Sequence, residues 1–203
     1  MKKIIKDAGV LFLITLIAGV LLGAVFKITK EPIAEQKEAQ KIAAYENVFS
    51  DMKEYTEISG DEISKAMSSI EKEGYDSVSL NECVKAFDKD NKELGMIITV
   101  TDKGGYGGDI KITVGIDSEG AITGLEILEI SETAGLGMNA KEESFRNQFK
   151  GIKADSVTYT KTGKEKDNEI DAISAATITT KSVTRAVNGA LIAYRTLGGA
   201  AIE

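Results

Sequence analysis

Hydroxyl side chains gather in one segment that could bind a phosphate. Residues 171–180 read DAISAATITT and open the last predicted helix. Ser174 and Thr177 are three residues apart, about one helical turn. Ala175 and Ala176 lie between them and leave the surface bare, and N–H groups at a helix N-terminus attract anions. Hydroxyls at this position also serve as helix caps, and taken alone the segment favours capping.

Glycines frame two further segments, each next to a predicted strand. Residues 104–108 read GGYGG. Glycine permits positive φ and a close approach of the backbone to a ligand, and Tyr106 adds a flat face and a hydroxyl. Residues 131–138 read SETAGLGM, so that two glycines flank Leu136, an apolar wall suited to a planar ligand. Taken alone, the first segment is also explained as a flexible hairpin loop and the second as a plain strand-to-helix connection.

Composition narrows the chemistry that these segments could perform. The 203 residues include no His and one Cys, which excludes His-based nucleophile relays, His-ligated metal sites and iron–sulfur clusters. If the protein carries electrons, they must sit on an organic cofactor. The formal net charge of −7 argues against nucleic acid as a partner. Cys83 lies among hydrophobic residues and is interpreted as a buried core residue rather than a redox thiol.

A membrane-spanning helix is predicted near the N-terminus. Residues 8–26 contain no charged side chain, and about 20 such residues span a bilayer. A cleaved signal peptide is the alternative, but its apolar core is shorter, roughly 7–15 residues, and no A-x-A sequence follows. Lysines crowded before the run favour a cytoplasmic N-terminus. Thr15, Gly19 and Gly23 are spaced by four and form a small-residue stripe on which a neighbouring helix could pack.

Helical periodicity returns after the apolar run and again at the end of the chain. Pro32 fits the first turn of a new amphipathic helix over about 33–56. Three- and four-residue spacing of apolar side chains predicts further helices at 61–73, 139–150 and 180–197.

Period-two patterns predict the strands that hold the glycine-rich segments. Alternating and β-rich runs between residues 77 and 130 predict an antiparallel meander of about four strands. One more short strand is predicted at 157–160, followed by a polar turn at 161–168. Strands and helices are segregated along the chain, so the predicted class is α+β, with an antiparallel sheet flanked by helices.

The three segments, taken together and in this order, resemble motifs of the FMN-binding domain family. Residues 171–177 resemble its D-x-x-[ST]-G-A-T motif, residues 105–108 its G-Y-G-G loop and residues 132–137 its E-T-P-G-L-G loop. Ala175 stands where the motif has glycine, a replacement that is free of strain only if the backbone there lies outside positive φ, and Ala134 stands where the loop has proline. With its anchor, the whole chain resembles the G subunit of the Rnf electron-transport complex, a relative of the C subunit of the Na⁺-translocating NADH:quinone reductase.

The resemblance implies a covalent flavin. In this family a separate flavin transferase esterifies the FMN phosphate to the motif threonine, here Thr177, which is a modification acceptor and not a catalytic residue. Asp171 and Ser174 match recognition and supporting positions, and the two glycine-rich loops would flank the isoalloxazine ring. No catalytic or metal-binding residue is implied. The implied cofactor-binding residues are Thr177, Ser174, Ala175, Ala176, Asp171, Tyr106, Gly107, Glu132, Thr133, Gly135, Leu136 and Gly137.

The resemblance also implies a location and partners. Residues 1–30 would form a cytoplasmic stub and the membrane helix, 31–75 a helical segment that packs on the domain, and 76–203 the FMN-binding domain. That domain would lie on the extracytoplasmic side of the cytoplasmic (inner) membrane. The membrane helix would pack against the other membrane subunits of the complex, which carries electrons from ferredoxin to NAD⁺ with ion movement. The chain would be one relay, without a substrate site of its own.

Two other functions are compatible with the same residues. The chain could be the FMN-carrying domain of another membrane or extracellular electron-transfer system. It could also be an anchored structural domain without a cofactor, in which residues 171–180 are only a helix cap.

Overall fold

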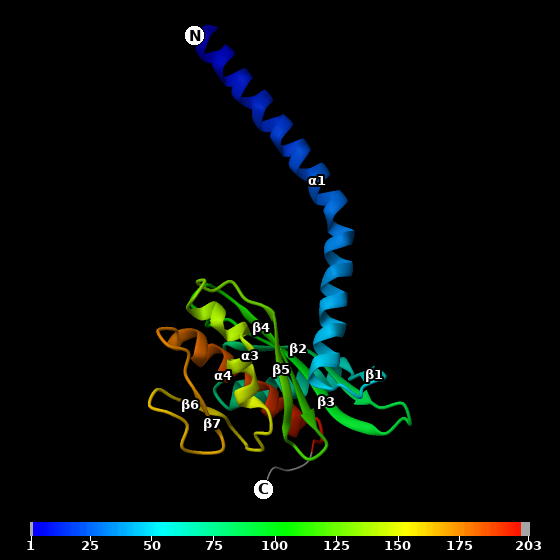
Figure 1. Cartoon of the computed structure of the whole chain (residues 1–203). Coiled ribbons are helices and arrows are strands. Elements are labelled where there is room, and N and C mark those ends of the chain that lie inside the picture. The colour runs from blue at the N-terminus through cyan, green and yellow to red at the C-terminus, as the bar shows by residue number, and fades with distance from the viewer. Residues whose placement is uncertain (1, 200–203) are drawn as a thin grey trace. The chain divides into compact units, whose positions relative to one another are not determined.

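The computed structural model describes residues 2–199 and divides into two units, Met1–Ile42 and Ala43–Glu203 (Figure 1). The second unit contains every element around the candidate site. The elements are α1 (Lys2–Val48), β1 (Glu54–Glu57), α2 (Gly60–Lys72), β2 (Val78–Phe87), β3 (Glu93–Asp102), β4 (Ile110–Asp117), β5 (Ile122–Glu129), the 3₁₀ turn η1 (Gly137–Lys141), α3 (Glu143–Arg146), the 3₁₀ turn η2 (Asn147–Phe149), β6 (Thr158–Thr160), β7 (Glu169–Asp171) and α4 (Thr177–Thr196).

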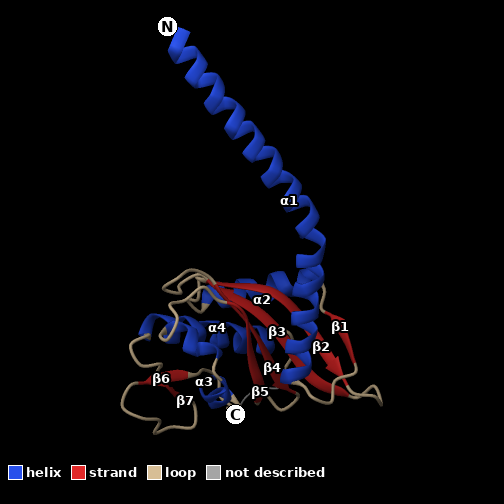
Figure 2. Cartoon of the chain, turned by 45° about the horizontal axis from the view of Figure 1, so that its top comes forward, coloured by secondary structure: helices blue, strands red, loops and turns tan. Residues whose placement is uncertain are grey.

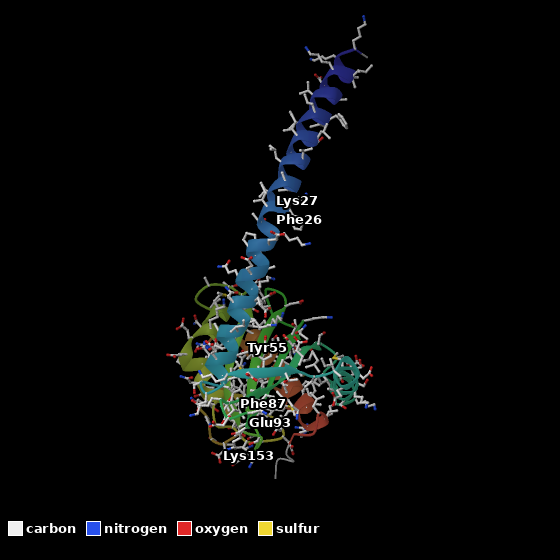
Figure 3. All side chains as sticks on the ribbon, turned by 90° about the vertical axis from the view of Figure 1, so that its right-hand side faces the viewer. Phe26, Lys27, Tyr55, Phe87, Glu93 and Lys153 are labelled. Atoms are coloured by element: carbon white, nitrogen blue, oxygen red, sulfur yellow. The ribbon has the colours of Figure 1, made fainter. Side chains whose placement is uncertain are left out.

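The N-terminal helix α1 contains the predicted membrane-spanning segment. It includes an 18-residue stretch of mean hydropathy 2.7, none of which is buried, and it is the one such helix among the described residues. Phe26 and Lys27, labelled in Figure 3, mark the end of the uncharged run. The prediction of a new helix at Pro32 is wrong, because Pro32 lies inside α1. Good helix formers surround the proline, so the helix continues at the cost of a backbone hydrogen bond.

The predicted end of that helix at residue 56 is also wrong. The helix ends at Val48, and the residues that follow form the edge strand β1, which pairs with β2 in register Tyr55↔Ala86. The Tyr55 ring packs edge-on against Tyr45 at a centroid distance of 5.6 Å. Backbone pairing with an existing strand outweighs helical spacing here, because tertiary contacts override weak local propensity.

The sheet confirms the predicted antiparallel meander and adds one strand to it. Its order is β1-β2-β3-β4-β5, and all pairings are antiparallel. Alternation along β4 places one row of side chains fully in the core. That row is Ile110, Ile112, Val114 and Ile116.

Helices α2 and α4 bury this face of the sheet (Figure 2). α4 contacts β2, β3 and β4, and α2 packs on α4 and β2. Val183, Val187 and Leu191 of α4 are fully buried in the same cluster. Packing against three strands fixes α4, whose N-terminal end forms part of the candidate site.

The opposite face of the sheet receives the last turn of α1. Tyr45 and Val48 are buried there against Ile97 and neighbouring residues. Gly115 and Gly124 pair across β4 and β5 and leave room for Val48, since a Cβ on Gly115 would lie 2.9 Å from the Val48 Cβ. The two glycines therefore provide the groove that this turn occupies.

The segment after β5 is less regular than predicted. In place of one helix over 139–150, it forms η1, α3 and η2 in succession. The predicted pairing of Phe145 with Phe149 is present as an edge-on contact of 5.6 Å, and Gly151 follows with φ of 82°. Strands β6 and β7 form a short parallel pair. The sequence predicted β6 but not β7, because three-residue strands carry almost no periodic signal.

Candidate functional site

The three segments singled out in the sequence meet at one cavity. The cavity has a volume of about 560 Å³ and lies where the N-terminal end of α4 meets the 104–108 and 131–138 loops. Eight of the twelve residues expected at a cofactor site line it, together with Ile178 and Thr179, which were not expected. The lining residues are Tyr106, Glu132, Thr133, Leu136, Gly137, Ala175, Ala176, Thr177, Ile178 and Thr179.

The N-terminus of α4 has no side-chain cap among the described residues. The helix begins at Thr177, three residues earlier than predicted. The first N–H groups of a helix have no intrahelical acceptor, so those of Thr177, Ile178 and Thr179 depend on another partner. The interpretation of the Ser174 and Thr177 hydroxyls as caps is therefore wrong. The end of a 20-residue helix instead offers N–H groups and positive potential at the cavity wall.

A different threonine stabilises the turn before the helix. The Thr180 hydroxyl accepts a hydrogen bond from the Ile173 N–H at 3.0 Å and donates one to the Ala176 carbonyl at 3.0 Å. Thr180 is fully buried. Because Thr180 satisfies this turn, Thr177 is left to line the cavity.

Ala175 adopts a backbone conformation with positive φ, which alanine rarely adopts. Its φ is 58°, in the left-handed region, where the resembling motif has glycine. The condition for an unstrained alanine, a backbone outside positive φ, is therefore not met at residue 175. Ala175 is exposed at the cavity wall rather than packed in the core, so the strain is local to the backbone.

Glu132 joins the two glycine-rich loops. Its Oε1 accepts a hydrogen bond from the Tyr106 N–H at 2.8 Å. Gly137 lets the second loop approach α4 closely, since a Cβ there would lie 2.6 Å from the Thr179 Oγ1 and 2.7 Å from the Glu132 Cβ. The loops and the helix end therefore form one continuous wall, which substitution of Gly137 would push apart.

Large apolar side chains stay exposed at this cavity. Tyr106 is 71%, Ile178 51% and Leu136 40% exposed. Within residues 43–199, the other large hydrophobic side chain that is exposed is Tyr55, at 37%. Apolar side chains gathered around one cavity are typical of a binding site for an apolar or aromatic ligand.

Four expected residues lie outside the cavity lining. Asp171 belongs to β7, where its N–H donates to the Gln148 Oε1 at 2.6 Å. It lines a neighbouring cavity of about 360 Å³ instead. Ser174 is exposed and lines neither of these two cavities. Gly107 and Gly135 do not line the cavity. Gly135 has φ of 75°, and Gly107 lets its loop approach the Ser131 carbonyl closely.

Sequence reasoning missed a buried carboxylate under the 104–108 loop. Asp102, at the end of β3, is fully buried and bonds to Arg185 and Ser182 of α4. Burial acts to raise the pKa of Asp102, but hydrogen bonds from Arg185, Ser182, Ser77 and the Gly104 N–H hold it below its usual value. The sequence did contain one signal for Asp102, because it ends an apolar run that was predicted to be a strand. An aspartate that is buried at such a position needs a paired partner.

Cys83 is fully buried, and burial raises the pKa of its thiol to about 12. This agrees with its interpretation as a core residue.

Comparison with known proteins identifies the family. Residues 105–192 match the FMN-binding domain family, and residues 1–48 match the RnfG N-terminal region. The chain is 32% identical to the G subunit of the proton-translocating ferredoxin:NAD⁺ oxidoreductase complex of Clostridium ljungdahlii, over 96% of this chain and 97% of that one. It is 30% identical to the G subunit of the Na⁺-translocating ferredoxin:NAD⁺ oxidoreductase complex of Acetobacterium woodii, over 97% and 94%.

A solved structure shares the fold. The C subunit of the Na⁺-translocating NADH-quinone reductase from Parabacteroides distasonis superposes with a TM-score of 0.52 at 23% identity, covering 74% of this chain and 80% of that one. The match of residues 1–48, the match of residues 105–192 and the similarity over nearly the full chain all indicate the same family. The chain therefore belongs to the family of G subunits of Rnf-type ion-translocating oxidoreductase complexes.

Proposed function

We propose that this chain is the membrane-anchored flavoprotein subunit of an Rnf-type ferredoxin:NAD⁺ oxidoreductase complex, and that it relays electrons through FMN linked by a phosphoester to Thr177. The observation that carries the proposal is the position of Thr177. It is the first residue of a long helix without a side-chain cap, at a cavity where all three motif segments meet.

The residues at the cavity fit both ends of FMN. The N–H groups and dipole of the α4 N-terminus suit a phosphate, and the small Ala175 and Ala176 give it access. Tyr106, Leu136 and Ile178 offer apolar surface to an isoalloxazine ring. A volume of about 560 Å³ is in the range of cofactor cavities.

The chain's own residues would bind and orient the flavin. When bound, FMN supplies one- and two-electron chemistry that no side chain of this protein can supply. The Thr177 hydroxyl would serve as the acceptor in maturation. Its oxygen forms a bond to the flavin-side phosphorus of FAD, the pyrophosphate bond breaks, AMP leaves, and the hydroxyl proton passes to a base of a separate flavin transferase. Glu132 would hold the Tyr106 loop in place through its bond to the Tyr106 N–H.

We also propose how the anchor is used. Residues 8–26 would cross the cytoplasmic membrane with the N-terminus inside, because three lysines precede the run. The domain over 76–203 would then lie on the extracytoplasmic side, where a covalent link prevents loss of the cofactor. Thr15, Gly19 and Gly23 would contact a helix of another protein in the complex.

Covalent attachment is tested on a denaturing gel. The full chain is co-expressed with a flavin transferase, and the gel is viewed under ultraviolet light. Wild-type protein should show a fluorescent band whose intact mass exceeds that of the chain by one FMN less one water. Thr177→Val should lose the band, while Thr162→Val, which makes the same change at an exposed threonine outside the three motif segments, should keep it. A wild-type chain without the added mass refutes the linkage and favours a non-covalent or cofactor-free domain.

A further inference from the structure

The buried carboxylate of Asp102 receives five hydrogen bonds. Its Oδ1 accepts from the Gly104 N–H, the Ser182 hydroxyl and Arg185 Nη2, each at 2.7 Å. Its Oδ2 accepts from the Ser77 hydroxyl and Arg185 Nε, each at 2.8 Å. Two carboxylate oxygens offer about four lone-pair sites, so this set leaves no acceptor capacity unused. The ion pair with Arg185 is bidentate, which fixes its geometry as well as its charge.

These donors belong to two walls of the candidate site. Gly104 begins the loop that carries Tyr106, while Ser182 and Arg185 are on α4, one to two turns after Thr177. The Arg185 guanidinium lies directly under the loop: a Cβ on Gly104 would collide with its Nη2. The carboxylate therefore joins the loop to the helix at a single point beneath the cavity.

Among the described residues, a second hydrogen bond supports the loop from the opposite side. The Tyr106 N–H is held by Glu132, on the opposite loop. The 104–108 loop is thus fixed at its start by Asp102 and at its centre by Glu132. With Asp102 loosened, the loop could move away from α4 while remaining attached to the second loop.

We propose that Asp102 and Arg185 are positioning residues, which set the placement of Tyr106 relative to Thr177 and so the orientation of the ring of the attached flavin. The proposal rests on the proposed function for its flavin part. Neither residue is among those that line the cavity. Their effect passes through the Gly104 N–H and the helix.

The same carboxylate provides a matched control. Ser77 also donates to Asp102, from the turn before β2. Its carbonyl accepts a hydrogen bond from the Lys103 N–H at 2.9 Å, a backbone contact that a change of the Ser77 side chain leaves in place. Ser77→Ala removes a hydrogen bond to Oδ2 and leaves the connection between the loop and α4 intact. Arg185→Lys keeps the positive charge but cannot reproduce the bidentate pairing. A role limited to general stability would loosen the whole domain, including β5, and not the 104–108 loop alone.

The first measurement does not require flavin. Hydrogen exchange is followed by mass spectrometry on the full-length, flavin-free chain in detergent, and the peptide with residues 104–108 is compared with one from β5. In Arg185→Lys the loop peptide should exchange about tenfold faster, the size expected for weakening a hydrogen bond to a charged group, while the β5 peptide stays unchanged. Ser77→Ala should leave both peptides as in wild type. Equal acceleration in both peptides, or in both variants, overturns the proposal.

The second measurement uses the flavinylated full-length chain. The isoalloxazine ring is achiral, so its visible circular dichroism reports how asymmetrically its surroundings hold it. Arg185→Lys should lose at least half of this signal per flavin, at an unchanged mass increment on Thr177, while Ser77→Ala keeps the signal. Asp102→Asn, which keeps the shape without the charge, should behave as Arg185→Lys does if it folds. A wild-type chain that carries no flavin refutes the proposed function. In that case the hydrogen-exchange result alone tests whether Asp102 and Arg185 position the loop. An unchanged dichroism in Arg185→Lys refutes the positioning role.

Discussion

Ala175 allows a sharp test, because two neighbouring Ala→Gly changes should have opposite signs. Ala175 has φ of 58° and is exposed, so Ala175→Gly removes strain without creating a cavity. An L-residue in the left-handed region costs roughly 1–2 kcal/mol. Glycine also gives the unfolded chain more conformational freedom, which lowers stability by roughly 0.4–1 kcal/mol and offsets part of this gain. The variant should therefore be more stable by about 0.5–1 kcal/mol.

The matched control is Ala172→Gly in the same segment. Ala172 is not among the residues with positive φ, and its N–H donates to the Thr160 carbonyl at 2.8 Å. Glycine brings no relief there and should destabilise the protein by roughly 0.5–1 kcal/mol.

Thermal unfolding of the flavin-free full-length chain measures both effects. For a domain of the size of Ala43–Glu203, about 1 kcal/mol corresponds to roughly 2–4 °C in Tm. Ala175→Gly should raise Tm by about 1–4 °C, and Ala172→Gly should lower it by a similar amount. If Ala175→Gly lowers Tm as Ala172→Gly does, the conformation assigned to residue 175 is wrong, and with it the geometry of the turn before Thr177.

Two further predictions concern the contacts that hold the site together. Gly137→Ala would place a Cβ 2.6 Å from the Thr179 Oγ1, so it should cost roughly 1–3 kcal/mol by overpacking and reduce flavin fluorescence on the denaturing gel; flavinylation and Tm equal to wild type would show that the loop does not need this close approach. The second prediction is a dependence of stability on acid. The pKa of Asp102 is lowered in the folded state, so its ionised form stabilises the fold above about pH 4, and this contribution is lost as the pH falls through the lowered pKa. Urea unfolding between pH 5 and 2 should show a smaller loss of stability in Asp102→Asn than in wild type, and parallel curves would count against the ionised, paired carboxylate.

The sequence predicted the strands and the long apolar N-terminal helix well, because both depend on local patterns. Alternation of apolar side chains over 110–116 requires no knowledge of distant residues, and neither does an uncharged run of 19 residues. The boundaries of the helices and strands were predicted less accurately. β1 exists because β2 is available to pair with it, and η1, α3 and η2 replace one helix because that segment follows the surface beneath β5.

The three motif segments were also visible in the sequence, and their order indicated one family. The functions of individual hydroxyls were not visible. Taken alone, the segment favoured Ser174 and Thr177 as caps, and only the family resemblance implied a flavin site there. In the structure the buried Thr180 satisfies the turn through bonds to Ile173 and Ala176. Which of several nearby hydroxyls faces inward depends on how α4 is rotated against the sheet, and that rotation follows from side-chain packing with three strands.

The sequence by itself limited the possible chemistry: with no His and one Cys, any electron transfer by this chain must use an organic cofactor. It also determined the fold class, since hydrophobic period is a local property of the chain. Only the tertiary structure decided that Tyr106, Leu136 and Thr177 line a single cavity, and that Asp102 lies beneath it. These residues are far apart in sequence, and their meeting depends on the pairing of β3 with β4 and the packing of α4 across them. Such long-range contacts leave no periodic signal in the segments that make them.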